Sequence, residues 1–341
     1  MNILKYICLP GLLVSGDIQT VSAVESKTDK NPNILVILID DAGYNDFGFM
    51  GSKEMQTPNI DALTSEGVVF TDAHVAATVS SPSRACLITG RYGHRFGYEC
   101  NLSDRTNGLP LEEETIAEVF KTNGYRTAAI GKWHLGSRDE QHPNNRGFDL
   151  FYGMKAGGRD YFYNEKKSDR PGDERNLLLN DRQVKFEKYL TDAFSEKAVE
   201  FINESSQPFM MYLAYNAVHT PMQATDEDMA KFEGHPRQKL AAMTYALDRG
   251  VGTVIRGLKD SGKFDNTLIF FLSDNGGATT NQSSNYPLKG FKGNKFEGGH
   301  RVPYFVVWKN GIPAGKPYDG LVSSLDIFAT AIDAASISKT R

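Results

Sequence analysis

Apolar residues occur in short runs that are separated by polar connections. The first run, at 34–39, is unbroken and ends in two aspartates. An unbroken apolar run, in contrast to an alternating one, indicates a strand that is covered on both faces. Further strands are predicted at 68–70, 127–130, 209–215, 267–272 and 303–308.

Amphipathic helices are predicted between these strands, because apolar residues recur there at intervals of three or four. One helix is expected to begin at Pro58, with Thr57 as its N-cap, and to end at Gly67. Other helices are predicted around 113–123, 194–202, 240–258 and 324–335. This alternation predicts an α/β fold in which a mostly parallel central sheet is sandwiched by helices.

Polar side chains follow four of the predicted strands. Because ligands of such sheets bind beyond the carboxyl ends of the strands, these side chains are expected to converge on one site. They are Asp40-Asp41, Lys132 with His134, His219, and Asp274-Asn275. The aspartates and the asparagine offer only oxygen ligands, which suit calcium or magnesium rather than zinc or copper. Taken singly, each pair is also typical of a turn or a helix cap.

Ser80 lies just before a predicted helix, since Pro82 suits the first helical turn. The N-terminus of a helix has free N–H groups and a dipole that favour an oxyanion. A serine before a helix is, on its own, more simply explained as a cap.

The segment SSPSR at 80–84, followed by TGR at 89–91, resembles the signature of the type I, formylglycine-dependent sulfatases of the alkaline phosphatase-like superfamily. Further blocks of that family occur in order. They are IDDAGY at 39–44, TPNID at 57–61, GKWHLG at 131–136, AVHTP at 217–221, SDNG at 273–276, GFKG at 290–293 and EGG at 297–299. The resemblance runs from about residue 33 to the end of the chain.

The resemblance implies that Ser80 is oxidised after synthesis to formylglycine, whose hydrate is a stronger nucleophile than a serine hydroxyl. It also implies a calcium ion (Ca2+) whose ligands are Asp40, Asp41, Ser80 in its modified form, Asp274 and Asn275. Serine in place of the commoner cysteine implies a bacterial source and a serine-type formylglycine-generating maturase as a partner.

The same resemblance implies roles for the remaining site residues. Arg84 is expected to stabilise the hydrated aldehyde, and Lys132 and Lys292 to neutralise charge on the sulfate oxygens. His134 is expected to act as a base, and His219 as the general acid for the departing alcohol.

Three residues outside these blocks are also considered. Asp248, within the long helix predicted at 240–258, is interpreted as structural. His94 and Arg95, after the Thr-Gly-Arg, are left open between a sugar contact and a solvated surface.

Charge and the N-terminal segment bear on where the protein acts. The net charge of −4 offers no bulk attraction to nucleic acid or to an anionic membrane. Residues 1–23 resemble a signal peptide, with Lys5 as the positive residue, a short apolar core and Val21-Ser22-Ala23 as the cleavage signal. The alternative is a disordered N-terminus. We expect export to the periplasm, a polar leader at 24–32 and a catalytic domain at 33–341, and no membrane span because the apolar core is too short.

Cys86 and Cys100 are expected to be semi-buried thiols, although an oxidising compartment would allow them to pair.

Members of the resembled family usually continue into a smaller C-terminal subdomain, which is expected to be absent or truncated here. Whether the chain is a fragment or a short member is left open.

The predicted function is hydrolysis of a sulfate ester on a sulfated saccharide. One alternative is a phosphonate monoester or phosphodiester hydrolase of the same superfamily. Another is an inactive protein that binds sulfated glycans. The complete set of lysine, histidine and aspartate residues favours the enzyme.

Overall fold

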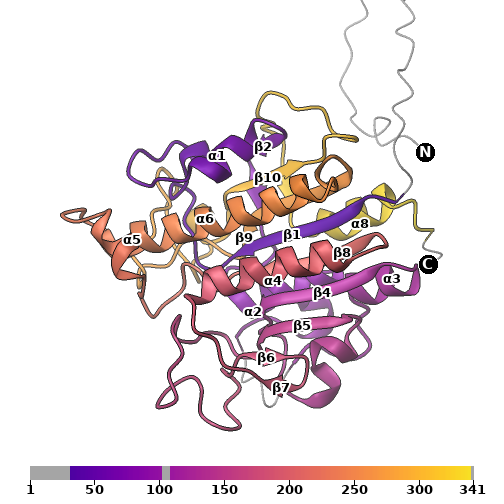
Figure 1. The fold of residues 1–341 in the computed structure, drawn as a ribbon. Helices are drawn as coiled ribbons and strands as arrows, with labels where there is room; N and C mark the ends of the chain where they lie inside the picture. The colour runs from indigo at the N-terminus through magenta and orange to yellow at the C-terminus, as the bar shows by residue number, and fades with distance from the viewer. Residues whose placement is uncertain (1–30, 102–107, 339–341) are drawn as a thin grey trace, which may run out of the picture.

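The computed structural model describes residues 31–101 and 108–338 (Figure 1). The predicted signal peptide at 1–23 and all but the last two residues of the polar leader lie outside the described residues. Within the described residues, no helix combines the length and the apolar character that crossing a membrane requires.

The described residues form one nine-stranded sheet with the order β2-β10-β9-β1-β8-β4-β5-β6-β7. Its central strands, from β9 to β5, are parallel, whereas β10 is antiparallel to both β9 and β2. The prediction of a mostly parallel α/β sheet is therefore confirmed. The strands are β1 (Asn33–Ile39), β2 (Val68–Phe70), β4 (Arg126–Lys132), β5 (Leu150–Met154), β6 (Leu178–Leu179), β7 (Arg182–Gln183), β8 (Phe209–Ala214), β9 (Thr267–Ser273) and β10 (Tyr304–Val307).

Helices cover both faces of this sheet (Figure 1). On β1, Leu35 and Ile37 pack into one core, whereas Val36 and Leu38 pack into the other. The alternation explains why the strand is apolar at every position, because each face of the sheet has its own core. The first core contains α1 (Pro58–Thr64), α4 (Leu190–Glu204) and α6 (Gln238–Asp260), and the second contains α2 (Ser80–Thr89), α3 (Ile116–Thr122) and α8 (Asp326–Ala334).

The start of α1 corrects one prediction. Thr57 precedes the helix, but its hydroxyl accepts from the N–H of Gly48 at 2.9 Å instead of capping α1. Asp248 of α6 supplies the cap, because its carboxylate accepts from the N–H groups of Asn59 at 3.2 Å and Ile60 at 2.8 Å. The structural interpretation of Asp248 is thus confirmed, and a tertiary contact replaces the local cap.

Other boundaries also differ from the predictions. The first residue of α2 is Ser80 itself, with Val79 before it, so the helix begins earlier than Pro82 indicated. The helix α1 ends at Thr64 rather than at Gly67. The strands β5, β6 and β7 and a second small sheet of β3 (Ala73–His74) and β11 (Val322–Ser323) were not predicted. All but β5 have only two residues, too few for a period, and the short apolar run of β5 contains Gly153.

Cys86 is buried, Cys100 is exposed, and both are free thiols. His94 and Arg95 lie exposed on a short turn at Gly93–Phe96, and their role stays open.

Candidate active site

Two adjacent parallel strands bring the aspartates together. Ile39 of β1 is paired with Ser273 of β9, so the residues that follow both strands leave the sheet at the same edge. The N–H of Asp41 lies 3.3 Å from Oδ1 of Asp274, and the Asn275 amide donates to Oδ1 of Asp41 at 2.8 Å. Asp40, Asp41, Asp274 and Asn275 are all buried.

The Ser80 hydroxyl lies within this group of oxygen atoms. Its Oγ is 3.2 Å from Oδ1 of Asp40 and 3.2 Å from Oδ1 of Asn275. The side chain stands at the first turn of α2, where backbone N–H groups lack helical acceptors. Ser80 is therefore placed both beside the carboxylates and at the positive end of a helix.

Three cations surround the carboxylates, each beside a different one. The guanidinium of Arg84, one turn after Ser80, donates to Oδ2 of Asp274 at 2.8 and 3.0 Å. The Lys132 ammonium donates to Oδ2 of Asp40 at 2.6 Å, and the Lys292 ammonium donates to Oδ2 of Asp41 at 2.8 Å. Arg84 also donates to the carbonyl of Lys132 at 3.1 Å, which ties α2 to the end of β4.

Burial and charge act in opposite directions on these groups. Burial on its own raises the pKa of Asp40, but the positive charges of Lys132, His219 and Arg84 outweigh it and hold that pKa below its usual range. The pKa of Asp274 is raised, first by burial and then by the Asp40 charge. Burial also lowers the pKa of Lys132, although Asp40 opposes this shift.

The two histidines approach the same site from different strands. His134 follows β4 and is buried, and burial together with the charges of Lys132 and Arg84 lowers its pKa well below the usual value. His219 follows β8, with Nε2 3.7 Å from Oδ2 of Asp41. Its Nδ1 is 2.7 Å from the carbonyl of Thr220, which only accepts, so Nδ1 carries a hydrogen.

The donor set fits a hard divalent cation. The carboxylate oxygens of Asp40 and Asp41 and a ring nitrogen of His219 lie within 4.8 Å of one another. The carboxylate of Asp274 and the amide oxygen of Asn275 belong to the same buried group. Such oxygen-rich sets suit calcium or magnesium. The sequence analysis placed His219 at this site, although not among the metal ligands.

The structure adds residues that no sequence block indicated. A Cβ on Gly157 would lie 2.6 Å from Nε2 of His134, and one on Gly158 would lie 3.4 Å from the His219 ring. The hydroxyl of Tyr161 donates to the carbonyl of His219 at 2.9 Å. These residues belong to a connection after β5, which has no strong periodicity, so only its two adjacent glycines offered a signal.

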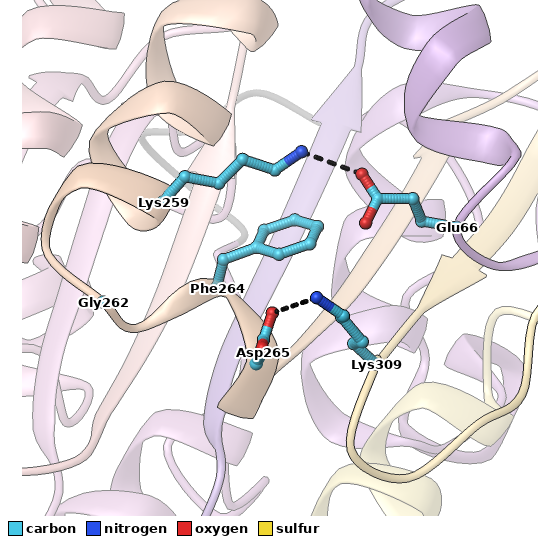
Figure 2. Close-up of a pocket in the computed structure, with 6 residues that line it drawn as sticks. All are labelled: Glu66, Lys259, Gly262, Phe264, Asp265 and Lys309. Carbon is cyan, nitrogen blue, oxygen red and sulfur yellow. Dashed lines mark hydrogen bonds and ion pairs between the residues drawn. The ribbon is translucent and has the colours of Figure 1, made fainter.

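A separate cavity of about 350 Å³ lies at the opposite end of β9 (Figure 2). Its charged side chains are paired, with Lys259 2.8 Å from Glu66 and Lys309 3.0 Å from Asp265. None of the predicted site residues lines it.

Comparisons with known proteins agree on one family. A family model described as Sulfatase matches residues 32–337. The chain is 34% identical to the uncharacterized sulfatase YdeN of Escherichia coli, covering 92% of this chain and 64% of that protein. It is 36% identical to mouse arylsulfatase G, covering 90% of this chain and 66% of that protein. The chain thus spans about two thirds of the length of these curated relatives.

Solved structures share the fold. Ps i-CgsB in complex with k-i-k-neocarrahexaose has a TM-score of 0.86 and 44% identity, covering 91% of this chain and 73% of that one. The PsFucS1 sulfatase from Pseudoalteromonas sp. has a TM-score of 0.75 and 27% identity, covering 92% of this chain and 69% of that one.

Proposed function

Because this chain belongs to the sulfatase family, we propose that it hydrolyses sulfate esters at the site around Ser80. The observation that carries the proposal is the position of the Ser80 hydroxyl, 3.2 Å from both Asp40 and Asn275 and at the first turn of α2. A nucleophile there would face a cation site on one side and a helix N-terminus on the other.

Two groups that the family implies fit this chain. Asp40, Asp41, Asp274, Asn275 and Ser80 would hold calcium, which supplies Lewis-acid stabilisation of a sulfate oxygen. Formylglycine derived from Ser80 supplies a hydrated aldehyde as the nucleophile. Arg84 is buried beside Asp274 and keeps its charge, so it orients the groups at the start of α2.

The two lysines would neutralise the sulfate group. Lys132 and Lys292 approach from β4 and from the connection before α7 (Glu297–His300), and each now donates to an aspartate. Charges fixed in a buried site need little rearrangement when negative charge develops on the substrate. The lysines would therefore stabilise the transition state through the charge on its sulfate oxygens.

The two histidines would divide the proton transfers. His134, whose pKa is lowered by burial and by Lys132, is neutral near pH 7 and suits a base. His219 already carries a hydrogen on Nδ1, and its Nε2 faces the cluster beside Asp41. A second proton on Nε2 would equip His219 to protonate the leaving alcohol.

A sulfated saccharide is the substrate class that we propose. It is supported by the likeness to Ps i-CgsB, whose solved complex contains k-i-k-neocarrahexaose. Export to the periplasm and oxidation of Ser80 by a serine-type maturase complete the proposal.

The test begins with protein made together with a serine-type maturase. We expect the mass of the peptide containing Ser80 to show the loss of two hydrogen atoms. Free sulfate should then appear from sulfated saccharides, and aryl sulfate should turn over faster than the phosphate ester of the same phenol. Ser80→Ala should abolish turnover, as should omission of the maturase. A faster phosphate or phosphonate reaction would favour the alternative hydrolase, and glycan binding without turnover by matured protein would favour the binding protein.

A further inference from the structure

A second group of metal-binding side chains lies outside the site around Ser80. His74 ends β3, and Glu297 and His300 stand three residues apart on the single turn of α7. Their ligand atoms all lie within 4.8 Å of one another. Nε2 of His74 is already 3.1 Å from Oε2 of Glu297. The set differs from the oxygen cluster because two of its three members offer nitrogen.

The backbone holds these side chains in place. The N–H of Val75 donates to the carbonyl of His300 at 2.8 Å, and His74 forms an antiparallel bridge with Arg301. A Cβ on Gly298 would lie 2.4 Å from the carbonyl oxygen of Gly290, so the turn packs tightly against the connection before it. Main-chain contacts thus hold the histidines and the glutamate together, in addition to the contact between His74 and Glu297.

The surrounding charges are compatible with a cation. Oδ1 of Asp72 is 3.9 Å from Nδ1 of His74, a separation that a small shift would close to a hydrogen bond. Carboxylates in this position orient metal-bound histidines. The positive charge of Arg301, 3.5 Å from Glu297, would repel a bound cation. Its guanidinium also donates to the carbonyl of Thr71 at 2.9 Å. With neutral histidines, Asp72, Glu297 and Arg301 leave one net negative charge.

Space is available for a further ligand. A cavity of about 390 Å³ is lined by His74, His300, Thr78, Tyr92 and Leu321, among others. His74 and His300 line this cavity, so a metal that they held together with Glu297 would keep an open position toward it. Three protein ligands with an open fourth position are typical of accessible zinc centres.

We propose that His74, Glu297 and His300 bind one divalent transition-metal ion, with Zn2+ as the ion that their nitrogen and oxygen donors favour. Imidazole ligands select zinc-like ions over calcium, so this site and the site around Ser80 take different metals. The bound ion would cross-link β3, which leads to α2, with α7, which follows Lys292. The proposal does not depend on sulfatase activity.

The test measures Zn2+ binding to the full chain in saturating Ca2+, by competition with a chromogenic chelator. A Cys100→Ser background removes the exposed thiol, which is itself a zinc ligand. We expect one Zn2+ per chain, and an affinity lower by about tenfold or more in His74→Ala, His300→Ala and Glu297→Gln. His94→Ala, which removes an exposed histidine elsewhere, should bind as the parent does.

Glu297→Gln is the decisive variant, because Glu297 is exposed and glutamine keeps the shape of its side chain, so we expect the fold to be retained. Circular dichroism without zinc checks that all variants are folded. Unchanged affinity in Glu297→Gln and in both histidine variants would overturn the proposal. Equal weakening in His94→Ala would do so too, because binding would then be unspecific.

Discussion

The Lys132 ammonium is buried against a single carboxylate, and burial determines what that ion pair contributes. Lys132 and Asp40 are 2.6 Å apart, and both side chains are fully shielded from solvent. Lys185 and Glu165 are 2.9 Å apart at the surface, with most of each side chain exposed. Water screens the second pair but not the first.

Lys132→Met tests this difference. The substitution leaves Asp40 buried beside fewer positive charges, which costs about 3–5 kcal/mol when one partner of a buried pair is removed. We expect denaturant unfolding without added metal to show that loss, and sulfate release to fall to the background. Lys185→Met should leave the free energy of unfolding unchanged. Equal free energies of unfolding for the two variants would contradict the claim that burial makes the Lys132–Asp40 pair important for stability.

A second residue links the site to pH. Burial, Lys132 and Arg84 hold the pKa of folded His134 well below its ordinary value of 6.5. Below pH 6.5 the unfolded chain therefore binds a proton that the folded chain does not. The free energy of unfolding consequently decreases as the pH is lowered, until the pH reaches the pKa of folded His134.

His134→Gln removes this contribution. Between pH 6.5 and the folded-state pKa, the variant should lose less stability per pH unit than the parent, by up to about 1.4 kcal/mol per unit. Thermal unfolding at a series of pH values measures the difference. Burial also lowers the pKa of His142, but that residue is present in both proteins and its contribution cancels. Parallel stability curves would show that His134 titrates normally.

At the scale of elements, the connection after β5 forms part of the wall behind both histidines. Gly157 lies against Nε2 of His134, and Gly158 lies at an ordinary contact distance from His219. Neither glycine has a positive φ angle, so alanine is compatible with the backbone at both positions.

Gly157→Ala should displace the His134 ring, because the new Cβ would approach it to 2.6 Å. A displacement of about 1 Å at a catalytic group costs about 100-fold in rate. The matched control is Gly158→Ala, whose Cβ would sit 3.4 Å from His219 and should be tolerated. Rates of sulfate release, with melting temperatures as a check on folding, test the pair. Similar rates for the two variants would mean that the connection after β5 shifts to accommodate the new Cβ and that the His134 ring is not displaced.

The elements that the sequence predicted well are those with an unambiguous period. The strand at β1 was predicted because its apolar run is unbroken, and α6 because its apolar positions keep helical spacing across 240–258. The cap by Asp248 was beyond the sequence, since it joins residues almost 190 positions apart. Gly157 and Tyr161 were missed for the same reason, as their partners are set by tertiary packing.

At the scale of the molecule, the sheet joins two separate hydrophobic cores and carries the oxygen cluster at one edge. Asp40 follows β1, and Asp274 follows β9, so both cores fix the cluster. Crowded carboxylates repel one another in the folded state, and a bound cation relieves that repulsion. Cation binding is therefore expected to stabilise the whole fold.

Calcium should accordingly raise the melting temperature even of protein with unmodified Ser80. At 100 times the dissociation constant, a ligand that binds only the folded state adds about 2.7 kcal/mol. Asp274→Asn removes one ligand and should abolish most of the calcium response. Asp46→Asn alters another buried carboxylate, paired with Arg237 at 2.7 Å, and should lower the starting stability but keep the response. A full calcium response in Asp274→Asn would place the ion elsewhere and leave Ser80 without its proposed partner.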